Sequence, residues 1–283
     1  MSEKVRKHIY IVDGHQFEVG ESGQGEPVLM LQVWHPYAKY FGQNLPQAIK
    51  RRVITVDVPG YYNGRQANPV TDVGQLVDLL EKLFDQMRLG QVDVVGQCLG
   101  GVIGVLLAAK YPKRIKKLVF ATPPFMYWEP GVNRTVRSYF ALLERGKRRK
   151  KWLAYVMRKS ILAKMADFFG GYHGVMGLIA RDAARSKSGF DERVFFGILG
   201  STFRCDLWKE MGKVECPVLL VAGERDKNGR NGKLKKAQEV MKKAEVKIIP
   251  RARHAMVLKN TQQFHQEVMR FLFSLLARER LDR

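Results

Sequence analysis

A chain of 283 residues with 46% hydrophobic side chains is long enough to bury the core of one large domain, or of a domain with an inserted lid. It has no unbroken apolar run of roughly eighteen residues and no apolar stretch after Met1, so we expect neither a membrane span nor a signal peptide, and a cytoplasmic protein. The formal charge of +22 would attract any anionic partner and selects none, while Cys98, Cys205 and Cys216 lack the spacing of a disulfide framework or a zinc site.

The first part of the chain alternates apolar strands with amphipathic helices, which predicts a parallel sheet. A hairpin comes first, because Asp13-Gly14 is a turn signal between two alternating segments. The expected elements are this hairpin over residues 10–20, strands over 28–33, 53–58 and 92–96, and helices over 45–50 and 72–87.

The segment VDVVGQCLGG, residues 92–101, reads as a buried strand that runs into a sharp turn and then into a helix over 99–110. Gly96 and Gly100 let the turn tighten without a Cβ clash, so the side chain of Cys98 is left bare at the strand end. The helix N-terminus favours a thiolate and an oxyanion at the same place. The pattern is typical of a nucleophile, and the alternative is a small buried thiol that only packs.

A strand over 115–121 is stopped by Thr122-Pro123-Pro124, and the alternation then breaks. Residues 125–212 are helical and rich in aromatic side chains, which predicts a helical cap inserted into a core made of residues 1–124 and 213–283. The alternation resumes with strands over 217–223 and 246–250 and helices over 234–243 and 262–277.

The densest basic run, residues 145–151, lies in this cap and precedes Trp152. A basic run beside an aromatic side chain can contact phosphates. We interpret it as a solvated helix face and expect no nucleic-acid partner, because no helix-turn-helix, RNP-like or finger motif accompanies it.

Four motifs, in this order, resemble the α/β-hydrolase family over nearly the whole chain. They are DVPGY at 57–61, GQCLGG at 96–101 with cysteine in place of the usual serine, GERD at 223–226 and PRARH at 250–254. The resemblance implies the α/β-hydrolase fold, with a mostly parallel central sheet flanked by helices and an inserted helical cap.

The family's chain order of nucleophile, acid and base falls on Cys98, Asp226 and His254. A thiol with an ordinary pKa of about 8.5 is mostly protonated at neutral pH, so the imidazole of His254 is needed to shift it toward thiolate. Asp226 would fix the tautomer of His254 and stabilise the imidazolium. Glu224 and Asp206 are alternative acids.

The resemblance also implies an oxyanion hole built from the amides of Leu99 and Trp34. Where the family usually has His-Gly after the third strand, this chain has Gln32-Val33, followed by Trp34-His35. A side-chain donor from Gln32 or His35 is therefore a candidate replacement. The expected pocket residues are Gln32, Val33, His35 and Gln97.

A thiol nucleophile implies a covalent thioester intermediate that water, an amine, a thiol or an alcohol can attack. The resemblance therefore implies an acyl hydrolase or acyltransferase acting on an ester, thioester or lactone, without metal or cofactor. The basic cap would suit an acidic carrier protein or a coenzyme A thioester. A non-catalytic protein that binds a small ligand, and a C–C hydrolase or lyase, remain alternatives on the same fold.

Overall fold

The computed structural model describes residues 5–31, 51–60, 67–128, 134, 191–226, 232–254, 256–259 and 261–281. The helix expected over 45–50, the end of the strand expected over 28–33, and most of the expected cap with its basic run lie outside these residues. No helix within the described ranges is long and apolar enough to cross a membrane.

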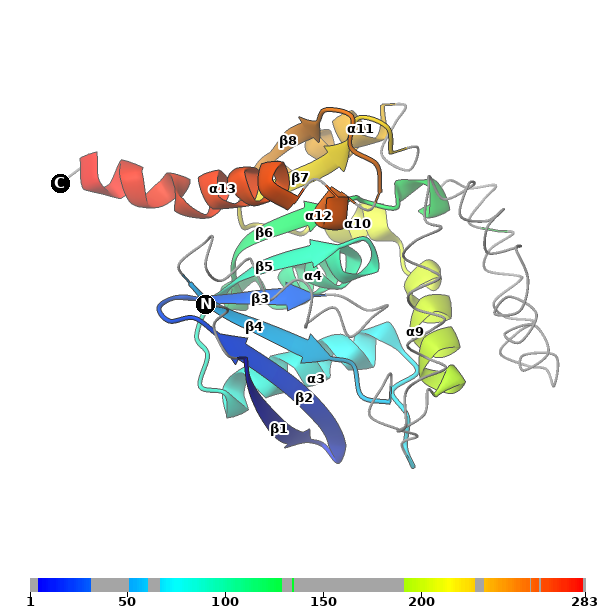
Figure 1. Cartoon of the computed structure of the whole chain (residues 1–283). Coiled ribbons are helices and arrows are strands. Elements are labelled where there is room, and N and C mark those ends of the chain that lie inside the picture. Colours follow the sequence, from blue (N-terminus) through cyan, green and yellow to red (C-terminus); the bar gives the residue numbers. More distant parts are fainter. Residues whose placement is uncertain are drawn as a thin grey trace.

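Eight strands form one sheet in the order β1-β2-β4-β3-β5-β6-β7-β8 (Figure 1). β1 pairs antiparallel with β2, β2 pairs antiparallel with β4, and the other neighbours are parallel, so the predicted mostly parallel sheet is confirmed. The strands are β1 (Arg6–Val12), β2 (His15–Ser22), β3 (Pro27–Leu31), β4 (Arg52–Asp57), β5 (Val92–Gln97), β6 (Ile115–Ala121), β7 (Val218–Gly223) and β8 (Ala244–Ile249).

The first two strands form the hairpin expected from Asp13-Gly14. Val12 pairs with His15, and the two residues between them have φ angles of 47° and 78°. Two consecutive positive φ angles are those of a type I′ turn, whose twist matches that of the flanking strands. Asn, Asp and Gly adopt this backbone conformation more readily than other residues, which is why Asp13-Gly14 predicted the hairpin.

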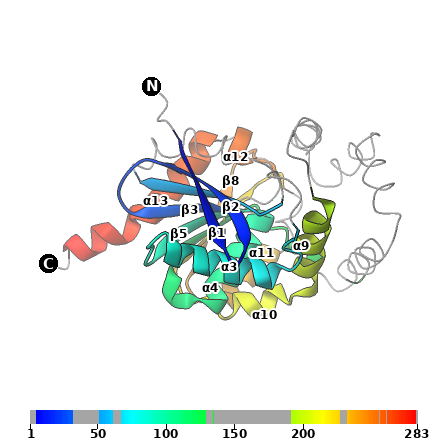
Figure 2. The ribbon, with the colours of Figure 1, turned by 90° about the horizontal axis from the view of Figure 1, so that it is seen from below.

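Helices cover both faces of the sheet, because neighbouring residues of each strand point to opposite sides. In β7, Val218 and Leu220 join the larger core, while Leu219 and Val221 join a second core on the other face. Figure 2 shows α3 and α4 on one side of the sheet and α12 and α13 on the other. The described helices are α3 (Val73–Gln86), α4 (Leu99–Lys110), α9 (Glu192–Arg204), α10 (Leu207–Met211), α11 (Lys233–Val240), α12 (Met256–Lys259) and α13 (Thr261–Leu281), with 3-10 turns η1 (Pro112–Arg114) and η2 (Phe125–Trp128).

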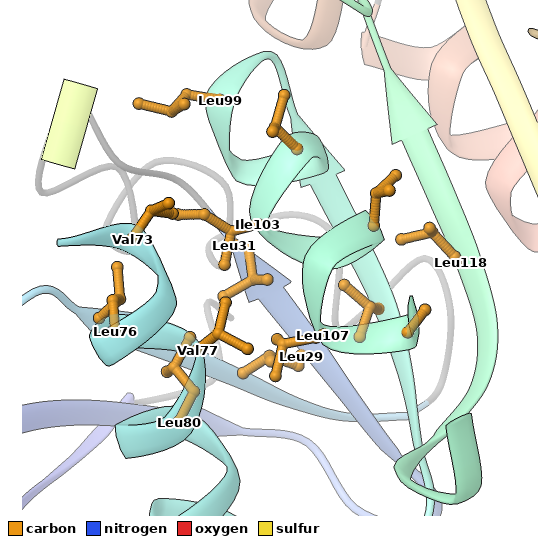
Figure 3. Packing of buried hydrophobic residues seen from close by; sticks show 14 of the residues in the cluster. Leu29, Leu31, Val73, Leu76, Val77, Leu80, Leu99, Ile103, Leu107 and Leu118 are labelled. Atoms are coloured by element: carbon orange, nitrogen blue, oxygen red, sulfur yellow. The ribbon is translucent and has the colours of Figure 1, made fainter. Parts of the chain in front are cut away.

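The helix that follows Cys98 is enclosed by the larger core, with nine of its residues buried: Leu99, Gly100, Gly101, Val102, Ile103, Gly104, Val105, Leu107 and Ala108. Leu99, Ile103 and Leu107 of α4 pack among Leu29 of β3 and Val77 of α3 (Figure 3). A helix that is apolar on nearly all sides is stable only when it is surrounded by other elements. The core therefore holds the N-terminus of α4, and the residue before it, in a fixed place.

Several element boundaries after β7 differ from those predicted, and the helix expected over 262–277 continues to Leu281 as α13. The helix expected over 234–243 ends at Val240, and the strand expected over 246–250 begins at Ala244. The cause is Met241, which is 1% exposed and takes an extended backbone (φ −95°, ψ 93°). Because Met241 is buried in this extended conformation, the helix ends at Val240, three residues before the predicted end at Lys243.

α9, in the last part of the predicted cap, is attached to the core at three points. The amide of Asp191 donates to the carbonyl of Gly60 at 3.1 Å, and the amide of Val73 donates to Ser201 Oγ at 2.8 Å. Gly197 leaves no room for a side chain, since a Cβ there would lie 2.5 Å from the carbonyl oxygen of Thr71. Figure 1 shows α9 beside the carboxyl ends of the parallel strands. The division into core and cap at residues 125 and 213 stays a prediction.

Candidate active site

Cys98 occupies the turn between β5 and α4 with φ 51° and ψ −115°. Its amide donates to the carbonyl of Ala121 in β6 at 2.9 Å. Gly96 makes the turn sterically possible, because a Cβ there would lie 2.5 Å from both the carbonyl oxygen of Gly100 and the amide nitrogen of Gly101. A non-glycine residue at positive φ is uncommon and concentrates at functional sites. The sharp strand–turn–helix predicted around Cys98 is confirmed.

The histidine and acid loops meet beside this turn. His254 Nδ1 lies 2.8 Å from Asp226 Oδ2, and the His254 and Asp226 side chains are 3% and 0% exposed. The ring of His254 also makes a side-chain hydrogen bond with Cys98. Three residues that are far apart in the sequence thus form one hydrogen-bonded triad of carboxylate, imidazole and thiol.

The neighbours of His254 in this triad raise the pKa of its imidazole. Burial lowers the pKa of the His254 imidazole, but the charge of Cys98, the hydrogen bond and charge of Asp226, and the hydrogen bond to Cys98 outweigh it and raise the pKa to about 10. An imidazolium that persists at neutral pH beside a thiol stabilises the thiolate. This electrostatic arrangement is the one that a nucleophilic cysteine requires.

The two alternative acids have other contacts. Glu224 Oε2 accepts a hydrogen bond of 2.7 Å from the amide of Arg251, and Asp206 caps α10 by accepting from the amide of Lys209 at 3.2 Å. The acid and histidine loops are joined directly as well, because the amide of Arg225 donates to the carbonyl of Ala252 at 2.8 Å. Among the three candidate carboxylates, Asp226 is therefore the one with a hydrogen bond to the His254 ring.

The expected oxyanion and pocket residues divide between described and undescribed parts of the chain. Leu99 is the first residue of α4, where an amide has no acceptor within the helix, and Gln97 ends β5 and donates to the carbonyl of His254 at 3.2 Å. Gln32, Val33, Trp34 and His35 lie outside the described residues.

Sequence reasoning missed Thr122, which it interpreted only as part of a strand stop. Thr122 is 0% exposed with φ 48°, follows β6, and donates its amide to the carbonyl of Val221 at 2.7 Å. Its Oγ1 has no hydrogen-bond partner among the described residues. A β-branched residue at positive φ has no sequence signature, because its conformation is imposed by the surrounding strands.

The other thiols have ordinary structural environments. Burial raises the pKa of Cys216 to about 12, and the Cys205 thiol donates to the carbonyl of Thr202 at 2.9 Å. Within the described ranges no group of three His, Cys, Asp or Glu side chains is arranged to hold a metal ion.

Comparison with known proteins agrees with the observed fold. The model of the alpha/beta hydrolase fold family matches residues 27–261. A putative 2-succinyl-6-hydroxy-2,4-cyclohexadiene-1-carboxylate synthase of Bacillus subtilis (strain 168) is 24% identical, over 95% of this chain and 98% of its own length. A pimeloyl-[acyl-carrier protein] methyl ester esterase of Chromobacterium violaceum is 27% identical, over 86% of this chain and 92% of its own.

A solved structure is also similar over nearly the whole chain. An epoxide hydrolase from Vigna radiata superposes with a TM-score of 0.71 at 18% identity, covering 95% of this chain and 98% of the other. At this identity the likeness concerns the fold alone, and activity has to be argued from the site.

Proposed function

Because this chain belongs to the alpha/beta hydrolase fold family, we propose that it is an acyl hydrolase or acyltransferase with Cys98 as its nucleophile. The observation that carries the proposal is the position of the His254 ring, which hydrogen-bonds Asp226 on one side and Cys98 on the other. A thiol that merely packed would need neither a charged imidazole beside it nor a buried carboxylate behind that imidazole.

In the first half of the reaction, the Cys98 thiolate attacks the acyl carbon of an ester, thioester or lactone, while His254 holds the proton that came from the thiol. The carbonyl oxygen becomes an oxyanion, for which the amide of Leu99 at the start of α4 is a donor. The intermediate collapses to a Cys98 thioester as the carbon–heteroatom bond breaks. His254 gives its proton to the departing alkoxide or thiolate.

In the second half, a water, alcohol, amine or thiol gives its proton to His254 and attacks the thioester carbon. Collapse of this second intermediate releases the acid or the transferred acyl product, and the Cys98 sulfur leaves as thiolate beside the imidazolium. Asp226 keeps one tautomer of His254 through both halves, because its carboxylate accepts from Nδ1 and leaves Nε2 to exchange the proton. We place the second oxyanion donor at Trp34.

We further propose an anionic carrier for the acyl group. The formal charge of +22 favours an acidic carrier protein or a coenzyme A thioester, and the Chromobacterium violaceum relative is named for an ester borne by an acyl-carrier protein. Neutralising the basic run 145–151 should lower turnover of carrier-bound acyl groups and spare simple esters. An equal loss for both substrates would contradict the carrier.

The experiment that tests the proposed function is incubation with a panel of p-nitrophenyl esters and acyl thioesters, followed by product release and intact mass. Wild type should turn over or gain one acyl group on Cys98, Cys98→Ala should do neither, and Cys98→Ser should form the corresponding oxygen ester. Silence across the panel, together with a Cys98 thiol that resists iodoacetamide at neutral pH, would contradict the enzyme and favour a non-catalytic binding protein.

A further inference from the structure

The backbone of the histidine loop is held by side chains from both of its neighbours in the site. On the acid-loop side, the Glu224 carboxylate accepts from the amide of Arg251. On the nucleophile side, Gln97 Nε2 donates a hydrogen bond of 3.2 Å to the carbonyl of His254 itself. This second contact joins residues 157 positions apart and ends on the residue that carries the imidazole.

Gln97 is fixed in space by the same elements that fix the nucleophile. It is the last residue of β5, it stands opposite Ala121 in the register with β6, and it immediately precedes Cys98. The amide of Cys98 also bonds the carbonyl of Ala121. Because Gln97 directly precedes Cys98, its hydrogen bond to the His254 carbonyl restrains the backbone of His254 relative to the backbone of Cys98.

This restraint differs from the one that Asp226 supplies. Asp226 contacts Nδ1 and so sets the tautomer of the imidazole and the direction of its ring. Gln97 contacts the main-chain carbonyl and so restrains where the histidine loop lies relative to Cys98. Rotation of the ring and displacement of the loop are independent movements, and a displacement of about 1 Å can cost on the order of 100-fold in rate.

We propose that Gln97 is a positioning residue that keeps His254 within reach of Cys98 by donating to the His254 carbonyl. The inference rests on the proposed function, because that function is what requires the thiol and the imidazole to stay together. It also explains why the residue before Cys98 has a side-chain donor long enough to reach the histidine loop.

Two substitutions and one matched control isolate this hydrogen bond. Gln97→Met keeps the length of the side chain and removes the donor. Gln97→Glu places a carboxylate against the carbonyl, which repels it when ionised and donates to it once protonated. Gln86→Met is the control, because Gln86 Nε2 donates a bond of the same kind to the carbonyl of Ile11 at 2.9 Å, at the end of α3.

The main readout is the rate at which iodoacetamide alkylates Cys98 in the full-length protein, followed on the Cys98 peptide between about pH 4 and about pH 8. kcat/KM on the best substrate of the ester and thioester panel is measured beside it. We expect Gln97→Met to be about tenfold slower than wild type at every pH. Gln97→Glu should be equally slow at pH 8 and should approach the wild-type rate as the pH falls through the carboxyl pKa of about 4.3. Gln86→Met should match wild type.

A Gln97→Met rate within about twofold of wild type, or a ratio of Gln97→Glu to wild type that does not change with pH, would overturn the inference. If Gln97→Met fails to fold, the pH dependence of Gln97→Glu decides, since recovery of rate at low pH is not expected from a merely unstable protein. Alkylation needs no substrate, so a wild type that is alkylated but neither turns over nor is acylated by any member of the panel contradicts the proposed function alone. Turnover with unaffected Gln97 variants contradicts this inference alone.

Discussion

The imidazole of His254 is buried and yet keeps its proton, because Cys98 and Asp226 outweigh the cost of burial and raise its pKa to about 10. A raised pKa means that the proton is held at neutral pH and is lost only as the pH rises through about 10. Below that pH the Cys98 sulfur has a positive neighbour, which favours its reaction with an electrophile. Its alkylation by iodoacetamide should therefore respond to the loss of the imidazole proton as the pH rises through about 10.

Asp226→Asn should move this response to lower pH, because the amide keeps the shape of the carboxylate but lowers the pKa of His254 again. Alkylation of Cys98 should slow at neutral pH, because the imidazole beside the thiol then carries less positive charge. Turnover should fall by roughly 1,000-fold or more. Peptide mass spectrometry against pH measures the first effect. Glu224→Gln, which keeps an acceptor for the Arg251 amide, should leave the alkylation profile of wild type unchanged, and a loss equal to that of Asp226→Asn would assign the acid to Glu224 instead.

The Thr122 hydroxyl is buried, and it has no hydrogen-bond partner among the described residues. Thr122→Val keeps the β-branched shape and its backbone strain and deletes only this hydroxyl. The free energy of unfolding in urea should stay within about 0.5 kcal/mol of wild type or rise by up to about 2 kcal/mol, because an unpaired hydroxyl destabilises a buried site. A decrease of more than about 1 kcal/mol would mean that the hydroxyl has a partner, such as a buried water.

How far sequence reasoning reached differs among these residues for physical reasons. Cys98 was predictable, because flanking glycines and a strand before a helix leave few other structures for that turn. Asp226 was assigned as the acid from its place in the GERD motif, and Glu224 remained an alternative because the two lie in one short turn. That turn is closed by the amide of Asp226 on the carbonyl of Gly223 at 2.9 Å, and sequence spacing does not give its direction.

At the level of elements, α4 and β6 match the predicted residues fully, because α4 is a nearly continuous apolar run and β6 is stopped by Thr122-Pro123-Pro124. The end of α11 was predicted three residues too late, since the lysines there are good helix formers and the burial of Met241 is a tertiary effect. Tertiary contacts also decide how α9 is attached, and Gly197 is where that attachment can be tested.

Gly197→Ala should loosen α9 from the core. An alanine in a free helix would stabilise it by about 1 kcal/mol, but here the added Cβ meets the backbone of Thr71, two residues before α3. We expect a net loss of about 1–3 kcal/mol in unfolding free energy and faster proteolysis around α9. Gly212→Ala is the matched control, because the nearest atom to a Cβ there is 3.4 Å away. Equal effects of the two substitutions would argue against the close contact between Gly197 and Thr71.

Across the whole molecule, charge is distributed unevenly between interior and surface. Inside, Arg51 pairs with Asp93 at 2.8 Å, and the Lys117 ammonium donates to the carbonyls of Phe271 and Leu272 in α13. These contacts tie β5 to the residue before β4, and β6 to the last helix, toward the end of the sheet opposite Cys98. Buried charges of this kind are screened little by salt, so the response of the protein to ionic strength reports mainly on its surface.

Added salt should stabilise the folded protein. With 49 basic and 27 acidic side chains, more pairs of like charge than of opposite charge act across the surface, and the exposed ion pairs, such as Arg270 with Glu245, contribute little each. Raising NaCl from about 0.1 M to about 1 M shortens the Debye length from about 10 Å to about 3 Å and screens the repulsion. Tm, followed by circular dichroism, should rise by a few degrees, and KCl should act equally. Lys242→Gln with Lys243→Gln, at two exposed positions, should raise Tm at low salt and reduce the salt effect. A Tm that falls with salt would show that ion pairs outweigh the excess positive charge.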